Sequence, residues 1–247
     1  MLTRNEILMV RSLADKSGRE EHGMFVVEGG KMVGELLNSQ LEVCRLFVTS
    51  RSGVKHPAAE LVSEKEMECM SRLKTPSDTL ALARIPRRET VSHKGLVLAL
   101  DKVQDPGNLG TIIRIADWFG VRCILASHDT VDCFNPKVVQ ATMGALYRVN
   151  VVYGELPEML TDMKQAGKRV YGTMLEGGHD IYAGELDNEG VLVMGSEGKG
   201  ISTEVSALLD ERLFIPPFPQ AGSGSESLNV AVATAVAVAE FRRRLHR

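Results

Sequence analysis

The stretch "SGSESLNVAVATAVAVAEFRRR", residues 223–244, joins a Gly/Ser-rich approach to a run of small, mostly apolar residues and then to a cluster of arginines. The run from Val230 to Ala239 is much shorter than the roughly 20 apolar residues of a membrane span, and a signal peptide lies at the other end of a chain. A helix that is apolar on nearly every side must be buried on nearly every side. The stretch therefore predicts a deeply packed C-terminal helix.

The composition is that of a globular protein with one large or two modest domains. The 247 residues are 44% hydrophobic and 25% charged, with a formal net charge of −3, so no basic field of the whole chain points to nucleic acid. The four cysteines form no Cys-x-x-Cys pair, and the six histidines form no ligand-spaced cluster with them. We expect reduced thiols, a cytoplasmic location, no metal and no membrane association.

The front of the chain alternates strands and helices. Thr3 and Glu6 have the spacing of a capping box ahead of an apolar-periodic helix. Further strands are expected at Met24–Glu28, Arg45–Thr49 and Leu80–Ile85, and helices at Lys31–Leu37 and Ser63–Met70. The proline-opened polar segment Pro86–Lys94 is the best candidate linker. We therefore expect one domain over residues 1–90 and a second over residues 91–247.

The second domain has the pattern of an α/β fold with a parallel sheet. Nearly continuous apolar runs alternate with helical segments, which is typical of strands covered on both faces. The expected strands are Leu96–Leu100, Cys123–Ala126, Val149–Val152, Val170–Met174, Val191–Met194 and Leu213–Ile215.

Three glycine-bearing polar segments follow strands of this sheet. They are "DKVQDPGNLGTIIRIADWFG" (101–120), "MGSEGKGIS" (194–202) and "IPPFPQAGSGSESLNV" (215–230). A glycine at any one such turn is more often structural than ligand-binding. Parallel sheets bind ligands beyond the carboxyl ends of their strands, so three such segments together predict a shared site. Lys199 has the wrong offset for a Walker A loop, and Gly222–Ser227 lacks the third glycine of a dinucleotide fingerprint.

Three ordered motifs in these segments resemble those of the SpoU (TrmH) class of RNA ribose 2′-O-methyltransferases, within the SPOUT superfamily. The motifs are Asn108–Ala116, Met194–Gly200 and 227–233, and the resemblance covers roughly residues 95–247. "FVVEGGKMVGELL", residues 25–37, resembles more loosely the small RNA-binding domain, similar to ribosomal protein L30e, that often precedes it. The approach to Ser227 is longer than in many relatives.

The resemblance implies a parallel-sheet domain whose C-terminal segment forms a deep trefoil knot, and a homodimer that completes the active site. The helix Ala231–Glu240 then passes through the knot and packs on a second subunit. The alternative is a final core helix of a monomer. The cluster Arg242–Arg244 is then a solvated terminus or an RNA phosphate contact.

The resemblance also implies that S-adenosylmethionine donates a methyl group to a ribose 2′-hydroxyl. Arg114 then either receives the hydroxyl proton or clamps the adjacent phosphate and stabilises the developing alkoxide. A guanidinium is ordinarily never neutral in proteins, which weighs against the first role.

The other implied site residues fall into two groups. Asn108 orients the Arg114 region or bonds the ribose, Glu197 holds the local polar geometry or pairs with Arg114 of the partner subunit, and Ser227 and Asn229 face the substrate. The cofactor contacts implied by the family are Gly195, Ile215 and Leu228, mostly through the backbone. Met174 belongs either to the pocket wall or to the core.

RNA is the expected substrate, with large-subunit rRNA favoured over tRNA because of the appended front domain. The basic side chains of that domain that could form an RNA-binding face are Arg4, Arg11, Arg19 and Lys31. A tRNA ribose methyltransferase, a base-nitrogen methyltransferase of the same superfamily and a catalytically silent RNA-binding assembly factor are the alternatives. The ribose-type Arg114 disfavours the base-nitrogen enzyme, and the intact motif residues disfavour the silent factor.

Overall fold

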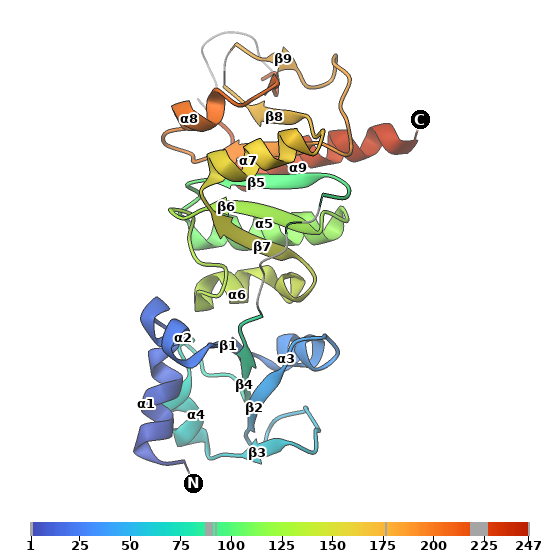
Figure 1. Cartoon of the computed structure of the whole chain (residues 1–247). Coiled ribbons are helices and arrows are strands. Elements are labelled where there is room, and N and C mark those ends of the chain that lie inside the picture. Colours follow the sequence, from blue (N-terminus) through green and yellow to red (C-terminus); the bar gives the residue numbers. More distant parts are fainter. Residues whose placement is uncertain (1, 87–90, 92, 176, 218–226, 247) are drawn as a thin grey trace. The chain divides into compact units, whose positions relative to one another are not determined.

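The chain divides into two compact units that do not follow a single cut in the sequence (Figure 1). The computed structural model describes residues 2–86, 91, 93–175, 177–217 and 227–246. The first unit comprises Met1–Arg87 and Asp132–Arg148, and the second comprises Arg88–Val131 and Val149–Arg247. Most of the predicted linker Pro86–Lys94 and of the long approach to Ser227 lies outside the described residues.

The first unit contains a four-stranded sheet in the order β1-β4-β2-β3. Strand β4 (Thr79–Arg84) pairs antiparallel with β1 (Met24–Glu28) and β2 (Val43–Val48), and β2 pairs parallel with β3 (Ala59–Leu61). Its helices are α1 (Arg4–Ser12), α2 (Lys16–His22), α3 (Gly30–Leu37) and α4 (Glu64–Met70). Apolar side chains of α1, α4 and the sheet form one buried core, including Leu13, Phe47 and Met67. The predicted elements of this unit are confirmed to within two residues, whereas α2 and β3 were not predicted.

Two helices of the first unit begin with capping boxes. Thr3 accepts a hydrogen bond from the backbone N–H of Glu6, and the Glu6 carboxylate accepts one in return from the N–H of Thr3, as the sequence predicts. Ser63 and Glu66 repeat the arrangement at α4. These reciprocal bonds satisfy backbone donors that a helix start otherwise leaves without partners.

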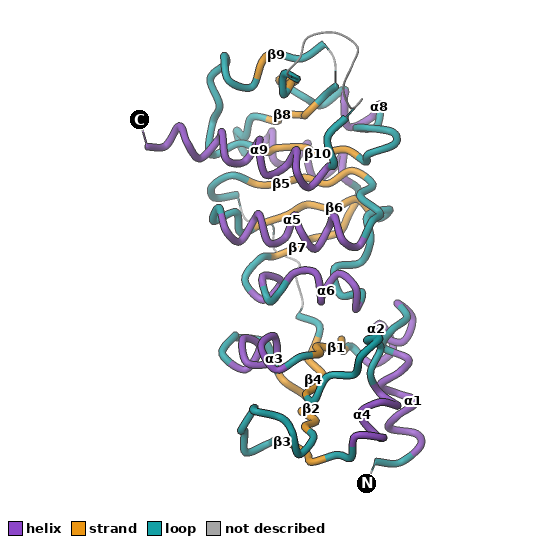
Figure 2. Tube along the Cα trace, turned by 180° about the vertical axis from the view of Figure 1, so that it is seen from behind, coloured by secondary structure: helices purple, strands orange, loops and turns teal. Residues whose placement is uncertain are grey.

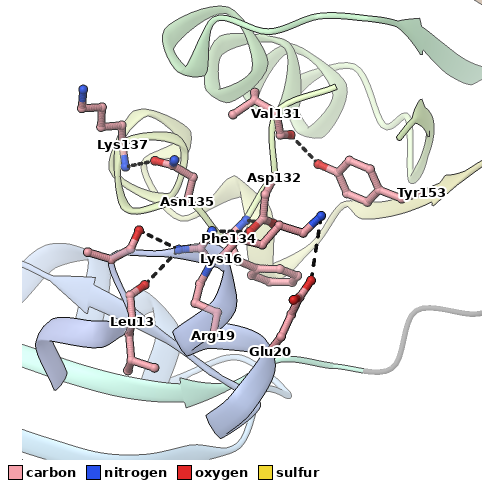
Figure 3. A network of polar contacts seen from close by, with 11 residues as sticks. Leu13, Lys16, Arg19, Glu20, Val131, Asp132, Phe134, Asn135, Lys137 and Tyr153 are labelled. Atoms are coloured by element: carbon pink, nitrogen blue, oxygen red, sulfur yellow. Dashed lines mark hydrogen bonds and ion pairs between the residues drawn. The ribbon is translucent and has the colours of Figure 1, made fainter. Parts of the chain in front are cut away.

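Residues 132–148 fold with the first unit although they lie between two stretches of the second unit in the sequence. The segment contains α6 (Pro136–Thr142) and a short 3₁₀ helix at Ala145–Tyr147. The guanidinium of Arg19 donates two hydrogen bonds to the Asp132 carboxylate, at 2.5 and 2.9 Å, and others to the carbonyls of Leu13 and Ala14 (Figure 3). Arg19 is only 2% exposed, so its expected place on a basic RNA-binding face is wrong.

The second unit contains a seven-stranded sheet in the order β7-β6-β5-β10-β8-β11-β9, and every pairing in it is parallel. The strands are β5 (Val97–Asp101), β6 (Cys123–Ser127), β7 (Asn150–Gly154), β8 (Val170–Thr173), β9 (His179–Asp180), β10 (Val191–Gly195) and β11 (Glu211–Phe214). The predicted α/β fold with a parallel sheet is therefore confirmed. The two-residue strand β9 was not predicted because no periodicity is visible at that length.

Helices cover both faces of this sheet. Helices α7 (Leu156–Gln165) and α8 (Thr203–Ser206) lie on one face, and α5 (Pro106–Trp118) and α9 (Val230–Arg243) lie together on the other, as the two opposite views show (Figure 2). Double coverage explains why these strands read as continuous apolar runs. In the part of the chain that the structure describes, no helix is long and apolar enough to cross a membrane.

Two arginines near the C-terminus, Arg242 and Arg244, are held by hydrogen bonds to other parts of the second unit. Arg244 donates hydrogen bonds to the backbone carbonyls of Ile181 and Gly184 and to the buried carboxylate of Glu240. Arg242 donates to the carbonyl of Phe119 and to Asn188. The expectation of a solvated terminus is therefore wrong for these two side chains, which attach the end of α9 to neighbouring loops.

Candidate functional site

The predicted site lies at the carboxyl end of the parallel sheet in the second unit. Strands β5 and β10 are neighbours in register, with Asp101 opposite Gly195, so the segments that follow them start side by side. Strand β8 lies between β10 and β11, so Met174, Gly195 and Ile215 follow or end three consecutive strands of the sheet. The strand order alone thus brings these three predicted cofactor residues to the carboxyl end of the sheet.

One residue from each motif meets in a hydrogen-bonded cluster, which we call the Asn-Glu-Asn cluster: Asn108, Glu197 and Asn229. The Glu197 Oε1 accepts hydrogen bonds from the Nδ2 atoms of Asn229 at 2.6 Å and Asn108 at 3.1 Å, and from the backbone N–H of Val230 at 3.2 Å. Asn229 Nδ2 also lies 2.8 Å from Asn108 Oδ1. Hydrogen bonds to an ionised carboxylate are stronger than neutral ones, so Glu197 is the centre that holds the three motifs together.

Helix capping fixes the two asparagines. Asn229 is the N-cap of α9, where its Oδ1 accepts the N–H groups of Ala231 and Val232, which leaves its Nδ2 to reach Glu197. Asp105 caps α5 by accepting the N–H of Asn108, with Pro106 at the first position of the helix. Because capping sets the direction of each first turn, both amides are presented at the helix starts rather than along the helix sides.

The loop of the second motif is tightly folded backbone. Ser196 and Gly200 exchange backbone hydrogen bonds of 2.8 and 3.1 Å. A Cβ placed on Gly195 would lie 2.2 Å from the carbonyl carbon of Gly200, and Gly200 itself has a φ of +65°. Both glycines are thus required by geometry. A loop of main chain at the carboxyl end of the sheet fits a cofactor that is held by backbone donors and acceptors, as the resemblance noted in the sequence implies for S-adenosylmethionine.

Arg114 does not join the Asn-Glu-Asn cluster within its own chain. It lies six residues after Asn108 in α5, about 9 Å along the helix axis. Its side chain is exposed and makes no hydrogen bond or ion pair with the residues that the structure describes. Thr111 and Trp118, which follow α-helical spacing on the same face, are also exposed, and Trp118 is 84% exposed.

The remaining predicted residues occupy the entrance to α9 and the strand ends. Ser227 and Leu228 precede the helix and are exposed. Ile215 directly follows β11 and is half-buried. Met174 is also half-buried, and its N–H donates to the carbonyl of Leu213 at 2.8 Å. Among the described residues, no group of three His, Cys, Asp or Glu side chains has the arrangement of a metal site.

Sequence reasoning passed over Asp101, although it begins the quoted segment 101–120. It is 2% exposed, and its Oδ2 accepts the backbone N–H of Ser202 at 2.7 Å. The only signal available in the sequence was an acidic residue directly after an apolar strand, and its partner is 101 residues away.

Comparisons with known proteins place this geometry in context. The profile of the SpoU rRNA Methylase family matches residues 95–239, and that of the MRM3-like substrate binding domain matches residues 4–81. The 23S rRNA (guanosine(2553)-2′-O)-methyltransferase RlmP of Bacillus subtilis is 31% identical, over 94% of each chain.

Several solved structures match nearly the whole chain. A Porphyromonas gingivalis protein assigned to the TrmH family of RNA methyltransferases has a TM-score of 0.89 at 40% identity and covers 99% of both chains. An AdoMet-bound rRNA methyltransferase from Sinorhizobium meliloti has a TM-score of 0.85 at 30% identity and covers 99% of this chain and 97% of its own.

Proposed function

Because this chain belongs to the SpoU rRNA Methylase family, we propose that it methylates a ribose 2′-hydroxyl of ribosomal RNA, with S-adenosylmethionine as methyl donor. The RNA 2′-O-methyltransferase activity and the donor follow from the family and the named relatives. The Bacillus subtilis relative, similar over both units, acts on 23S rRNA, which supports rRNA over tRNA. The observation that carries the proposal is the Asn-Glu-Asn cluster, in which one residue of each family motif meets the other two.

When bound, the cofactor supplies a methyl group made electrophilic by a sulfonium. The chain's own residues must then align the ribose oxygen and make a weakly acidic hydroxyl nucleophilic. We propose that Gly195, Ile215, Leu228 and Met174 line the cofactor position at the consecutive strand ends. Gly195 and its folded loop provide the backbone surface, and the exposed Leu228 provides an apolar wall.

We assign the substrate side to Arg114, Ser227 and Asn229. A cationic guanidinium at the hydroxyl clamps the neighbouring phosphate and stabilises negative charge on the oxygen, which needs no neutral arginine. The exposed Ser227 offers a hydroxyl to the ribose or the phosphate. Asn108 and Glu197 act on the substrate indirectly because their mutual bond fixes Asn229.

We propose that the active unit is a homodimer in which Arg114 reaches the Asn-Glu-Asn cluster of the partner subunit. Arg114, which is exposed and has no partner among the described residues, and the exposed Trp118 on the same face of α5 support this arrangement. So does α9, where Val232 is 51% exposed although the helix is nearly all apolar. An apolar surface of this kind is expected to be covered by another protein. A trefoil knot around α9, an L30e-like front unit and a cytoplasmic location belong to the same proposal by family resemblance.

The decisive experiment compares Arg114→Lys with wild type. Methyl transfer from labelled S-adenosylmethionine to 23S rRNA and to bulk tRNA is measured, and the modified nucleotide is mapped by mass spectrometry. The lysine keeps the charge but loses the planar fork, so turnover should fall by about 100-fold or more while cofactor affinity stays within about twofold. Arg122→Lys, in the same unit and paired with Asp117, is the matched control and should keep full turnover.

The outcomes separate the candidate functions. Methylation of tRNA alone would contradict the rRNA assignment. Tight binding of rRNA with no methyl transfer by wild type would favour an assembly factor. Full turnover by Arg114→Lys would rule out both roles considered for Arg114.

A further inference from the structure

Asp101 is an acidic side chain at the end of an otherwise apolar strand. It ends β5, whose other residues are all buried and apolar, and it is itself only 2% exposed. Its Oδ2 accepts one hydrogen bond, from the backbone N–H of Ser202, and no other partner lies among the described residues. A buried carboxylate with a single donor is costly compared with an apolar side chain in the same place. We therefore looked for a structural role of this carboxylate in holding neighbouring backbone in place.

The bond to Ser202 closes the base of the loop that carries Glu197. Within the loop, Ser196 and Gly200 are joined by their own backbone bonds. The loop then continues through Ile201 to Ser202, where Asp101 ties it back to the neighbouring strand. Gly195, at the other end of the loop, lies opposite Asp101 in the strand register. One side chain thus fixes the return of the loop next to its start.

The end of β5 is also fixed on its other side. The N–H of Lys102 donates to the Ser127 hydroxyl at 2.9 Å, and that hydroxyl lies 3.1 Å from the hydroxyl of Thr130. Lys102 has a φ of +60°, which turns the chain away from the sheet directly after Asp101. Asp101 is therefore held by its backbone, and its carboxylate is a fixed point rather than a mobile acceptor.

We propose that Asp101 is a positioning residue for the cofactor loop. Its carboxylate holds the N–H of Ser202 so that the segment 195–202 keeps the folded form that presents its backbone to S-adenosylmethionine and projects Glu197 toward Asn108 and Asn229. This inference rests on the proposed placement of the cofactor at Gly195. It assigns to Asp101 no contact with substrate or reacting atoms.

The test measures S-adenosylmethionine binding to the full-length protein by calorimetry, alongside thermal unfolding. Asp101→Ala removes the acceptor and should raise the cofactor Kd by about tenfold or more. Asp101→Asn keeps an oxygen that can accept the same N–H, so its Kd should return to within about threefold of wild type. This rescue would not occur if only the charge of Asp101 mattered.

A matched control separates positioning from general stability. Asp210 also accepts a backbone N–H in the same unit, that of Val170 at 2.9 Å, but at the amino end of the strands, opposite to the cofactor loop. Asp210→Ala should lower the unfolding temperature and leave the cofactor Kd unchanged. Equal losses of affinity in Asp210→Ala and Asp101→Ala would contradict the proposal.

Ser202→Pro tests the same bond from the donor side, and it applies even if Asp101→Ala fails to fold. Ser202 has a φ of −62°, which proline adopts, and proline has no N–H. The Kd should rise as in Asp101→Ala. An unchanged Kd in either variant, or a Kd in Asp101→Asn as high as in Asp101→Ala, would overturn the inference. If wild type itself bound no S-adenosylmethionine, the proposed function would fail instead.

Discussion

Gly195 has no room for a side chain in the loop 195–202, where we propose that the cofactor binds. A Cβ there would approach the backbone carbon and oxygen of Gly200 and the nitrogen of Ile201 to 2.2–2.5 Å. These are main-chain atoms of a hydrogen-bonded turn, so they cannot swing aside as a flexible side chain would.

We expect Gly195→Ala to raise the Kd for S-adenosylmethionine by about tenfold or more, because the turn must open to make room for the alanine side chain. Gly198→Ala is the matched control in the same loop, since an added Cβ there meets no atom within 4 Å and should change the Kd little. Calorimetric titration of both variants checks the prediction. Similar Kd values for the two would show that the close approach at Gly195 does not govern binding.

The sequence predicted that residues of the three motifs would lie together, but it did not predict how they bond. Motif order singled out Asn108, Glu197 and Asn229, and the structure brings these three together. The bonding of Asp101 could not be predicted because its partner is a backbone N–H, which carries no residue-type signal. The burial of Arg19 could not be predicted for a related reason, since Asp132, with which it makes a partly buried ion pair, is 113 positions away.

The two capping boxes make the stability of their helix starts dependent on pH. The backbone and hydroxyl bonds from Thr3, with Arg45 beside it, lower the pKa of Glu6 from 4.5 to about 2. Bonds from Ser63 and from the N–H of Leu2 lower the pKa of Glu66 from 4.5 to about 2. Because each pKa is lower in the folded than in the unfolded chain, the stability that each carboxylate contributes is complete above pH 4.5 and is lost as the pH falls toward 2.

We therefore expect Glu66→Gln to be less stable than wild type at neutral pH, with a difference that shrinks as the pH falls through this window. Urea unfolding of both proteins over a pH series gives the measurement. Glu68→Gln lies in the same helix and serves as control, because its carboxylate accepts no hydrogen bond among the described residues, so its loss should change the stability little. A constant difference for Glu66→Gln would count against the capping interpretation.

Most elements were predictable because periodicity and capping are local. The capping box at Thr3 and the apolar strands of the second unit were found within one or two residues of their observed ends. The strands β3 and β9 were missed because three or two residues cannot display a period. The position of β10 between β5 and β8 comes from tertiary packing, so it could not be predicted from local sequence patterns.

The exposed face of α5 bears on whether the protein forms a dimer. Trp118→Glu places a charge where we propose a second subunit to pack, so self-association should weaken by about tenfold or more, and turnover per chain should become dependent on protein concentration. Sedimentation velocity over a dilution series measures the first effect. Leu61→Glu, at a side chain that is 72% exposed in the first unit, is the control and should leave assembly unchanged. Identical sedimentation of Trp118→Glu and wild type would argue against this interface.

The two-unit organisation was only partly accessible from sequence. A break near residue 90 follows from the proline-opened polar segment, and the two family profiles end and begin on either side of it. Nothing local in residues 132–148 indicates that they fold with the first unit. Their partners there, such as Phe25 for Phe134 with ring centroids 4.9 Å apart, are distant in sequence.

The return of residues 132–148 to the first unit has a practical consequence for engineering. Exchange of the front of the chain between relatives, as a way to redirect a methyltransferase to a new RNA, would ordinarily use a single splice point near residue 90. Here such a chimera would pair Arg19 and Phe25 of one parent with the Asp132 and Phe134 positions of the other. A transplant of the first unit must therefore be made in two pieces, with the internal segment 132–148 carried along with the N-terminal one.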